Sequence, residues 1–189
     1  MRPVTACLIG LCLAVRLVSG MGRNRTVLDV LFIAEPGTPL LANILAGQVW
    51  RVATPMFIHF GVLHLLFNMI WMWDLGNRLE ARQGSGFLVL FVLFLGSLAN
   101  LAQYFVTANP LYGGMSAVIY GLLGYVWIRG SSPRYGLRLY TSTVVTMLVW
   151  FVLCWVGLLG PVANWAHSAG LACGVAWGYI DRWRARGVA

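Results

Sequence analysis

A serine at the start of an apolar stretch is the residue of this sequence best placed to do chemistry. Ser116 follows Gly113 and Gly114 and opens a run that predicts a helix. A hydroxyl at a helix N-terminus lies beside outward-pointing backbone N–H groups, which favour developing negative charge. The two glycines let the backbone turn sharply just before it. Ser116 is therefore a candidate nucleophile, although a small residue packed between two membrane helices would give the same local pattern.

All three histidines lie in or beside apolar stretches, where an ionisable side chain is a candidate functional group. His64 and Asn68 are four residues apart and share one face of a predicted helix, with His59 near its start. His167 opens the last apolar stretch. A serine with a histidine base predicts acyl transfer at a dyad of Ser116 and His167.

Donors for an oxyanion are also available in this set. They are the side chains of His64 and Asn68 and the backbone N–H of Ser116. No Asp or Glu is expected at the same depth, so the acidic third member of a triad is missing. Tyr120 lies one helical turn after Ser116, and its ring could orient His167 by stacking on it.

A zinc protease is the competing chemistry for the histidines. His59 and His64 do not have the H-E-x-x-H spacing, and no carboxylate lies nearby to activate water. The four cysteines match no zinc pattern and are interpreted as small buried hydrophobic residues. Nothing in the sequence suggests a metal or an organic cofactor.

The composition excludes an ordinary soluble domain. Of the 189 residues, 60% are hydrophobic and 10% are charged, whereas soluble domains carry about 25% charge. We therefore predict an all-α integral membrane protein with a single domain over residues 1–189. The net charge of +8 is unevenly placed, so it indicates membrane topology and not a nucleic-acid partner.

The spacing of charged residues predicts the number of spans. Stretches of 22, 46 and 42 residues without charge lie between Arg51 and Asp74, between Arg82 and Arg129, and between Arg138 and Asp181. Because a span needs about 20 residues, these stretches hold one, two and two helices. Turns inside the longer two are expected at Asn109–Gly114 and Gly157–Asn164.

The first 20 residues leave two interpretations open. Arg2 and Arg16 flank an apolar run, which is typical of a secretory signal peptide or of a short span whose Arg16 reaches to the interface. Counted as a span, the run brings the total to six transmembrane helices. Residues 22–53 are too polar to span and too apolar for a free linker, so we predict a partly embedded first external loop.

The arginines predict the orientation, because this residue is enriched in cytoplasmic loops. One side carries Arg2, Arg78, Arg82, Arg129, Arg134, Arg138, Arg182, Arg184 and Arg186, and the other carries Arg23, Arg25 and Arg51. Both termini are therefore expected in the cytoplasm. Ser116 then lies near the outer end of the fourth helix.

Small residues form two stripes that can bring the dyad together. Gly170, Gly174 and Gly178 follow His167 at intervals of four, and Ala117, Gly121 and Gly124 follow Ser116. Faces of this kind let two membrane helices touch backbone to backbone. The same stripes would place Ser116 within hydrogen-bond reach of His167.

With these motifs in this order, the sequence resembles the rhomboid intramembrane serine proteases, of the compact bacterial GlpG type. The similarity extends from about Trp50 to Asp181. The matching residues are Trp50-Arg51, His59, His64 to Asn68, Leu75-Gly76, Glu80, Gly84-Ser85, Gly113 to Ser116, Tyr120, Ala166-His167, Gly170 and Gly174.

The resemblance implies a role for each site residue. Ser116 would be the nucleophile and His167 the general base and acid, with Tyr120 stacked on the base. His64, Asn68 and the Ser116 backbone N–H would form the oxyanion hole, with Gly114 and His59 in support. Arg51 and Glu80 would be structural, holding the first loop and the inner end of the second helix.

The resemblance also implies six helices in the inner (plasma) membrane around a water-filled cavity open to the outside, with the first 20 residues retained as helix one. The substrates would be single-pass membrane proteins that enter sideways past helix five and are cut near their outer ends, at small residues. No metal, cofactor or nucleic acid would be needed.

Ala117 departs from the glycine that usually follows the serine in this family, and the methyl group is expected to affect helix spacing and turnover. A rhomboid-like pseudoprotease that binds transmembrane clients without cutting is therefore the alternative. A channel or small transporter would explain buried polar groups, but not their fit to a nucleophile, a base and oxyanion donors.

Overall fold

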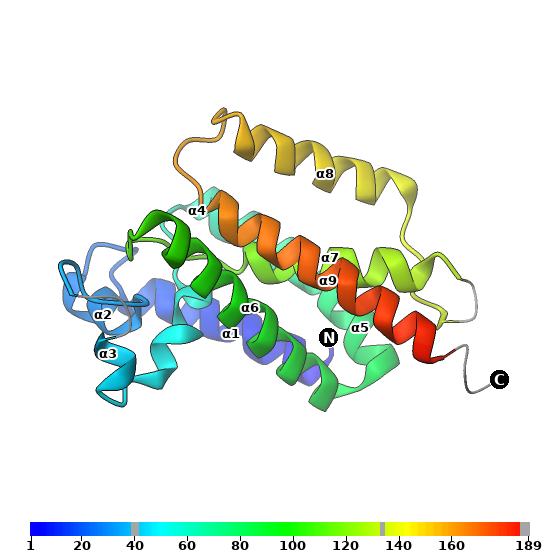
Figure 1. The fold of residues 1–189 in the computed structure, drawn as a ribbon, viewed down its shortest axis with the longest axis horizontal. Helices are drawn as coiled ribbons and strands as arrows, with labels where there is room; N and C mark the ends of the chain where they lie inside the picture. Colours follow the sequence, from blue (N-terminus) through cyan, green and yellow to red (C-terminus); the bar gives the residue numbers. More distant parts are fainter. Residues whose placement is uncertain (39–41, 133–134, 186–189) are drawn as a thin grey trace.

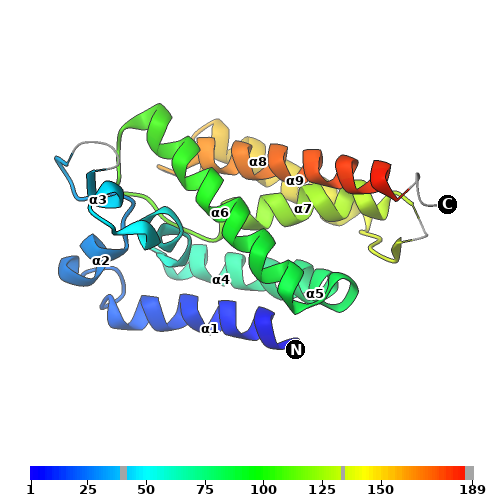
Figure 2. The same ribbon diagram turned by 60° about the horizontal axis from the view of Figure 1, so that its bottom comes forward.

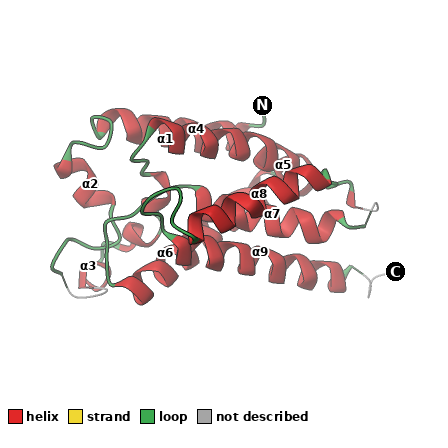
Figure 3. Ribbon diagram, turned by 90° about the horizontal axis from the view of Figure 1, so that it is seen from above, coloured by secondary structure: helices red, strands yellow, loops and turns green. Residues whose placement is uncertain are grey.

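The structure, a computed structural model, describes residues 1–38, 42–132 and 135–185. These residues form helices and loops, with no β-strand among them (Figure 1, Figure 3). The helices at the predicted spans are α1 (Pro3–Val18), α4 (Val62–Trp71), α5 (Asn77–Gln83), α6 (Ser85–Thr107), α7 (Ser116–Gly130), α8 (Thr141–Trp155) and α9 (Asn164–Arg184). The other elements are α2 (Arg25–Leu31), α3 (Ala42–Leu45), the 3₁₀ turns η1 (Val49–Val52) and η2 (Thr54–Phe57), and the π-helical turn η3 (Met72–Gly76).

Helices occupy each of the six stretches that the sequence predicts, and loops fall at both predicted turns. Among the described residues, α6 is the one helix long and apolar enough by itself to cross a membrane, with a mean hydropathy of 2.1. The helices α1 and α8 are apolar but shorter, at 16 and 15 residues. The helical content is thus confirmed, while the crossing of the membrane by all six stays a prediction.

The two chain termini lie at the same end of the helix bundle. The start of α1 and the end of α9 are both at the opposite end from α2 and α3 (Figure 2). Arg134 and Arg186, which contribute to the predicted orientation, lie outside the described residues. The arrangement agrees with two termini on one side of a membrane, and their location in the cytoplasm stays a prediction.

Glu80 joins the second predicted span to the first helix. This span is built from α4, η3 and α5, and at η3 Gly76 lies close to Thr5 of α1. The carboxylate of Glu80 accepts hydrogen bonds from the backbone N–H groups of Val4 and Thr5, at 3.0 and 2.8 Å, and from the Ser85 hydroxyl at 2.8 Å. It therefore satisfies N–H groups at the start of α1, which have no partner within that helix.

Arg51 organises the first loop from its centre. Its guanidinium is buried, donates to the backbone oxygen of Phe32 at 2.9 Å and to the Gln48 side chain at 2.6 Å, and pairs with Glu35 at 3.2 Å. A buried arginine with several acceptors holds separate backbone segments at fixed positions. The loop thus has helices and a hydrogen-bonded centre of its own.

Arg16, interpreted from the sequence as a side chain that reaches to the membrane interface, makes its contacts within the protein, and its position relative to the membrane stays a prediction. Arg16 is buried at the end of α1, where its guanidinium donates to the backbone oxygen of His59 at 2.8 Å and to that of Met21. Carbonyl groups of the following loop take the place of water around the charge, because a guanidinium has five N–H donors to satisfy. Arg16 therefore ties α1 to the segment before α4.

Helices α7 and α9 pack backbone to backbone, as the small-residue stripes predict. A Cβ atom added to Gly170 would lie 2.0 Å from the carbonyl oxygen of Ala117, and one added to Gly174 would lie 1.9 Å from that of Gly121. Both distances are far below van der Waals contact, so these positions accept glycine alone at the present helix separation. By contrast, α8 stands apart along one side of α9, and most of its side chains are exposed (Figure 1).

Candidate active site

The close pairing of α7 and α9 sets Ser116 beside His167. Ser116 is the first residue of α7 and is half-buried, while His167 lies in the first turn of α9 and is buried. The Ser116 Oγ atom and the His167 Nε2 atom are 2.8 Å apart. This is a normal hydrogen-bond length between a hydroxyl and a ring nitrogen. The proximity that the two stripes predict is therefore present.

The turn before Ser116 is held by the segment that precedes α4. Gly114 has a φ of +134°, and its N–H donates to the backbone oxygen of Pro55 at 3.0 Å. The Met115 N–H points to His59 Nε2 at 3.5 Å, and the other ring nitrogen of His59 lies 3.1 Å from the backbone oxygen of Phe57. The buried His59 therefore supports the loop before the serine and does not approach its hydroxyl.

Gly114 also leaves room for His64. A Cβ atom at Gly114 would lie 2.7 Å from His64 Cε1 and 3.5 Å from Ser116 Oγ. The His64 ring, half-buried, thus fills the space beside the serine and makes a tilted contact with the His59 ring at 5.2 Å between centroids. A side chain at position 114 would push these groups apart, which is a reason for glycine independent of the backbone angle.

Asn68 lies one turn after His64 and makes a contact within its own helix. Its Nδ2 atom donates to the His64 backbone oxygen at 2.7 Å, and its Oδ1 atom is buried without a hydrogen-bond partner among the described residues. An amide nitrogen carries two hydrogens, so one donor remains. The predicted face shared by His64 and Asn68 is present, and their part in an oxyanion hole stays a prediction.

Tyr120 lies against the histidine as the sequence predicts. The ring centroids of Tyr120 and His167 are 5.0 Å apart with 49° between the planes, and Phe151 of α8 makes an edge contact with the Tyr120 ring at 5.4 Å between centroids. His167 Nδ1 is buried and has no hydrogen-bond partner among the described residues. The Tyr120 ring is therefore in place beside the imidazole, and its part in orienting His167 stays a prediction.

Ala117 points into a cluster of small side chains. Its buried methyl group packs with Ala99 of α6 and with Ala166 of α9. The Ala117 methyl group is therefore expected to affect the spacing of α7 from α6 and α9 at this point only, because alanines on both neighbouring helices leave room for one methyl group. The carbonyl group of Ala117, and not its side chain, forms the close contact with Gly170.

Sequence reasoning missed Gln103, which fixes the start of α9. The Gln103 Oε1 atom accepts a hydrogen bond from the Ala166 N–H at 3.1 Å. It thus satisfies one of the free N–H groups in the first turn of α9, one residue before His167. The signal was available in the sequence, since a glutamine within an apolar helix is a candidate functional or packing group.

This arrangement can carry out acyl transfer. The hydroxyl has a histidine ring nitrogen at hydrogen-bond distance and lies at the start of α7, where the first backbone N–H groups of a helix have no partner within it. Within the described ranges, no three His, Cys, Asp or Glu side chains lie close enough together to hold a metal ion.

Comparison with known proteins identifies the family. The rhomboid domain model matches residues 46–184. Proteins named rhomboid protease GlpG from Salmonella paratyphi A, Salmonella typhi and Salmonella newport are each 36% identical over 186 residues, which is 97% of this chain. The chain spans 65% of the length of these relatives. This chain therefore belongs to the rhomboid family of multi-pass membrane proteins.

Proposed function

We propose that this protein is an intramembrane serine endopeptidase that uses Ser116 and His167 as a catalytic dyad. The observation that carries the proposal is the 2.8 Å contact between Ser116 Oγ and His167 Nε2 at the start of an apolar helix. The names of the relatives agree with it, since they are rhomboid proteases. No metal or cofactor takes part in the proposed reaction.

The reaction follows from the roles of the two side chains. His167 Nε2 takes the hydroxyl proton while Ser116 Oγ attacks a peptide carbonyl, and the oxygen of the tetrahedral intermediate becomes negative. The Ser116 N–H, His64 and Asn68 stabilise that charge. The protonated His167 gives its proton to the leaving amine, which leaves an acyl group on Ser116. Water, deprotonated by His167, then releases the acid and restores the serine.

The proposed setting is a single domain of six spans in the plasma membrane, with both termini in the cytoplasm and the first loop partly embedded. The dyad then lies near the outer face, within reach of water. The substrates are the transmembrane segments of single-pass proteins, cut near their outer ends at small residues. They enter past α8, whose loose packing against the other helices supports this route.

The alternative is a rhomboid-like pseudoprotease that binds transmembrane clients without cutting them. Its one support in the sequence is Ala117, and the alanine cluster around this methyl group weakens that support. The alternative also leaves the contact between Ser116 and His167 without a role.

Changing Ala117 to glycine tests this point. We expect cleavage equal to or higher than that of the wild type, because the methyl group fills a space between small residues and does not hold the dyad apart. Glycine within a helix costs up to about 1 kcal/mol of stability, so the unfolding midpoint is expected to fall slightly. A clear decrease in the initial rate of cleavage, measured at a temperature where both proteins are folded, would show that the steric account is wrong.

Changing Asn68 to alanine tests the oxyanion hole. We expect the cleavage rate to fall by at least about tenfold, as for other oxyanion donors. Leu63→Ala on the same helix is the control, because that side chain is exposed and should leave the rate near that of the wild type. A full rate for Asn68→Ala would assign Asn68 to packing alone.

The function itself is tested with purified protein in liposomes and a model substrate with one transmembrane segment. We expect the wild type to release two fragments on a gel and Ser116→Ala to release none. Folded wild-type protein that cuts none of several such substrates would favour the pseudoprotease. A conductance that persists in Ser116→Ala, without proteolysis in the wild type, would favour a channel.

A further inference from the structure

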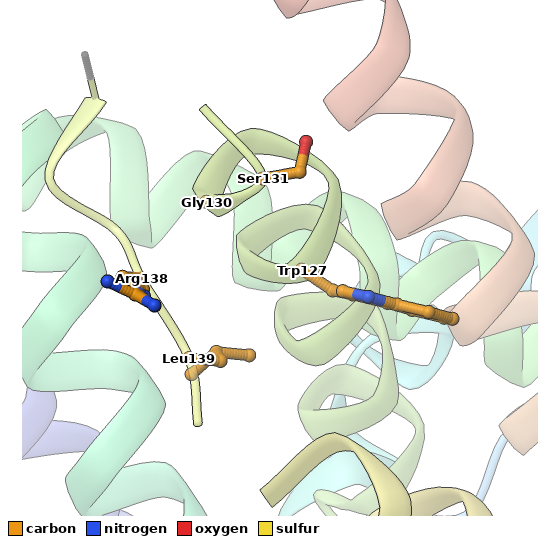
Figure 4. Close-up of a pocket in the computed structure, with 5 residues that line it drawn as sticks. All are labelled: Trp127, Gly130, Ser131, Arg138 and Leu139. Atoms are coloured by element: carbon orange, nitrogen blue, oxygen red, sulfur yellow. The ribbon is translucent and has the colours of Figure 1, made fainter. Parts of the chain in front are cut away.

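A cavity at the other end of the molecule, away from the dyad, is unaccounted for by the proposed reaction. It has a volume of about 370 Å³ and lies between the end of α7 and the segment that leads to α8. Its lining residues are Trp127, Gly130, Ser131, Arg138 and Leu139 (Figure 4). The end of α7 and the segment before α8 are in close contact beside the cavity, since a Cβ atom on Gly130 would lie 2.2 Å from the Leu137 carbonyl oxygen.

The cavity combines an apolar wall with a cationic rim. Trp127 is 39% exposed and Leu139 is half-buried, so both offer apolar surface. Arg138 is exposed and is the neighbour of Leu139 on the segment before α8, across from Trp127 on α7 (Figure 4). A soluble anion would contact Arg138 and leave the apolar side chains of Trp127 and Leu139 in contact with water. An amphiphile would contact the arginine with its charged group and the two apolar side chains with its hydrocarbon part.

The surrounding charges leave an excess of positive charge. Asp181 is the carboxylate near this end of α7, and it is already paired with Arg129 at 3.1 Å and accepts the Tyr125 hydroxyl at 2.6 Å. Arg182 donates to Ser131 Oγ at 2.6 Å, which brings a further guanidinium to the cavity wall. Neither Arg138 nor Arg182 has an ion-pair partner among the described residues.

The end of α7 itself does not cancel this charge. The last carbonyl groups of a helix carry partial negative charge when they are free. Here the Ile128 oxygen accepts the Ser131 hydroxyl at 2.7 Å, and the Arg129 oxygen accepts the Ser132 N–H at 3.4 Å. These two carbonyl groups at the end of α7 therefore have hydrogen-bond donors.

We propose that this cavity binds the headgroup of an anionic phospholipid from the cytoplasmic leaflet. Arg138 would hold the phosphate, Ser131 and Arg182 would contact the headgroup, and the first part of the acyl chains would lie on Trp127 and Leu139. Arginine matches the geometry of a phosphate, and basic pockets between helices on the cytoplasmic side bind anionic headgroups. The inference rests on the topology proposed above, which places this end of α7 at the inner leaflet.

The test measures lipid binding to the full chain, without proteolysis. The protein is released for native mass spectrometry from micelles that contain equal amounts of phosphatidylglycerol and phosphatidylcholine. We expect one retained phosphatidylglycerol, and an occupancy about fivefold lower for Arg138→Gln, since each arginine near an anionic surface contributes about that factor. Arg184→Gln removes the same charge from an exposed position on α9 and should bind as the wild type does.

Three results would overturn the proposal. Equal retention of the two lipids would remove the selectivity for an anionic headgroup, and equal losses for the two variants would indicate a diffuse charge effect. Displacement of the lipid by inorganic phosphate would assign the site to a free anion. Lipid binding by Ser116→Ala should match that of the wild type, because Ser116 lies away from the cavity. A protein without protease activity can therefore still retain the lipid, and a protein that does not retain the lipid can still cleave, so the two proposals fail separately.

A second measurement does not depend on Arg138. Phosphatidylglycerol brominated near the top of its acyl chains quenches nearby tryptophan fluorescence. We expect the quenched part of the signal to be smaller in Trp127→Phe than in the wild type, and brominated phosphatidylcholine to give a smaller difference. No difference between the two proteins would contradict the placement of the acyl chains on Trp127.

Discussion

Changing His167 to alanine is expected to lower the rate of substrate cleavage by at least about 1,000-fold, as for other members of a nucleophile and base pair. Without the imidazole, no other side chain among the described residues is at hydrogen-bond distance to take the proton from Ser116 Oγ. The initial rate of cleavage of a single-span substrate in liposomes measures the loss.

The control for this variant is a measurement of stability, which shows whether the lost activity results from unfolding. His167 is buried, so alanine leaves a cavity, and the unfolding midpoint should be compared for His167→Ala, His167→Gln and the wild type. Glutamine fills more of the space but is not a general base, so it should be as inactive as alanine and more stable. A folded His167→Ala that keeps more than about a tenth of the wild-type rate would remove His167 from the mechanism.

Changing Gly174 to alanine is expected to destabilise the protein by about 3 kcal/mol and to lower cleavage by about 100-fold. The added methyl group would lie 1.9 Å from the Gly121 carbonyl oxygen and 2.8 Å from its Cα atom, and backbone cannot move aside as a flexible side chain can. Helices α7 and α9 must therefore separate, which moves His167 away from Ser116. Thermal unfolding and cleavage rates measure the two effects.

Gly10→Ala is the matched control for this prediction. Gly10 also lies within a helix, and a Cβ atom there would have no other atom within 4 Å. Alanine at this position should leave activity unchanged and raise stability slightly, because it has the higher helix propensity. If Gly174→Ala unfolded at the same temperature as Gly10→Ala, the close packing of α7 on α9 would not be a determinant of the fold.

The sequence predicted those features that depend on simple periodicity. Helices occur at all six predicted spans, five of them in the three uncharged stretches and one in the N-terminal run, because long apolar runs must form helices in an apolar environment. The pairing of α7 with α9 followed from glycines at intervals of four, and it brought Ser116 and His167 together. Tyr120 was placed on His167 by the same helical repeat.

Contacts between distant loops and side chains could not be predicted in this way. Nothing in the sequence of α1 shows that the guanidinium of Arg16 would donate to the carbonyl groups of Met21 and His59. The bond from the Ala166 N–H to Gln103 joins two helices 63 residues apart in sequence, without a periodic pattern. The π-helical turn within the second predicted span, at whose end Gly76 lies close to Thr5 of α1, likewise has no signal in the charge spacing.

The measurement that tests the central claim most directly is covalent labelling with a fluorophosphonate, followed by peptide mapping. This probe reacts with serines that a base activates, so labelling needs the nucleophile and the base but no substrate. We predict a single adduct on Ser116 in the wild type, and none in Ser116→Ala or His167→Ala. An adduct on another serine, or folded wild-type protein that does not react, would contradict the assignment of Ser116 and His167 as a catalytic dyad.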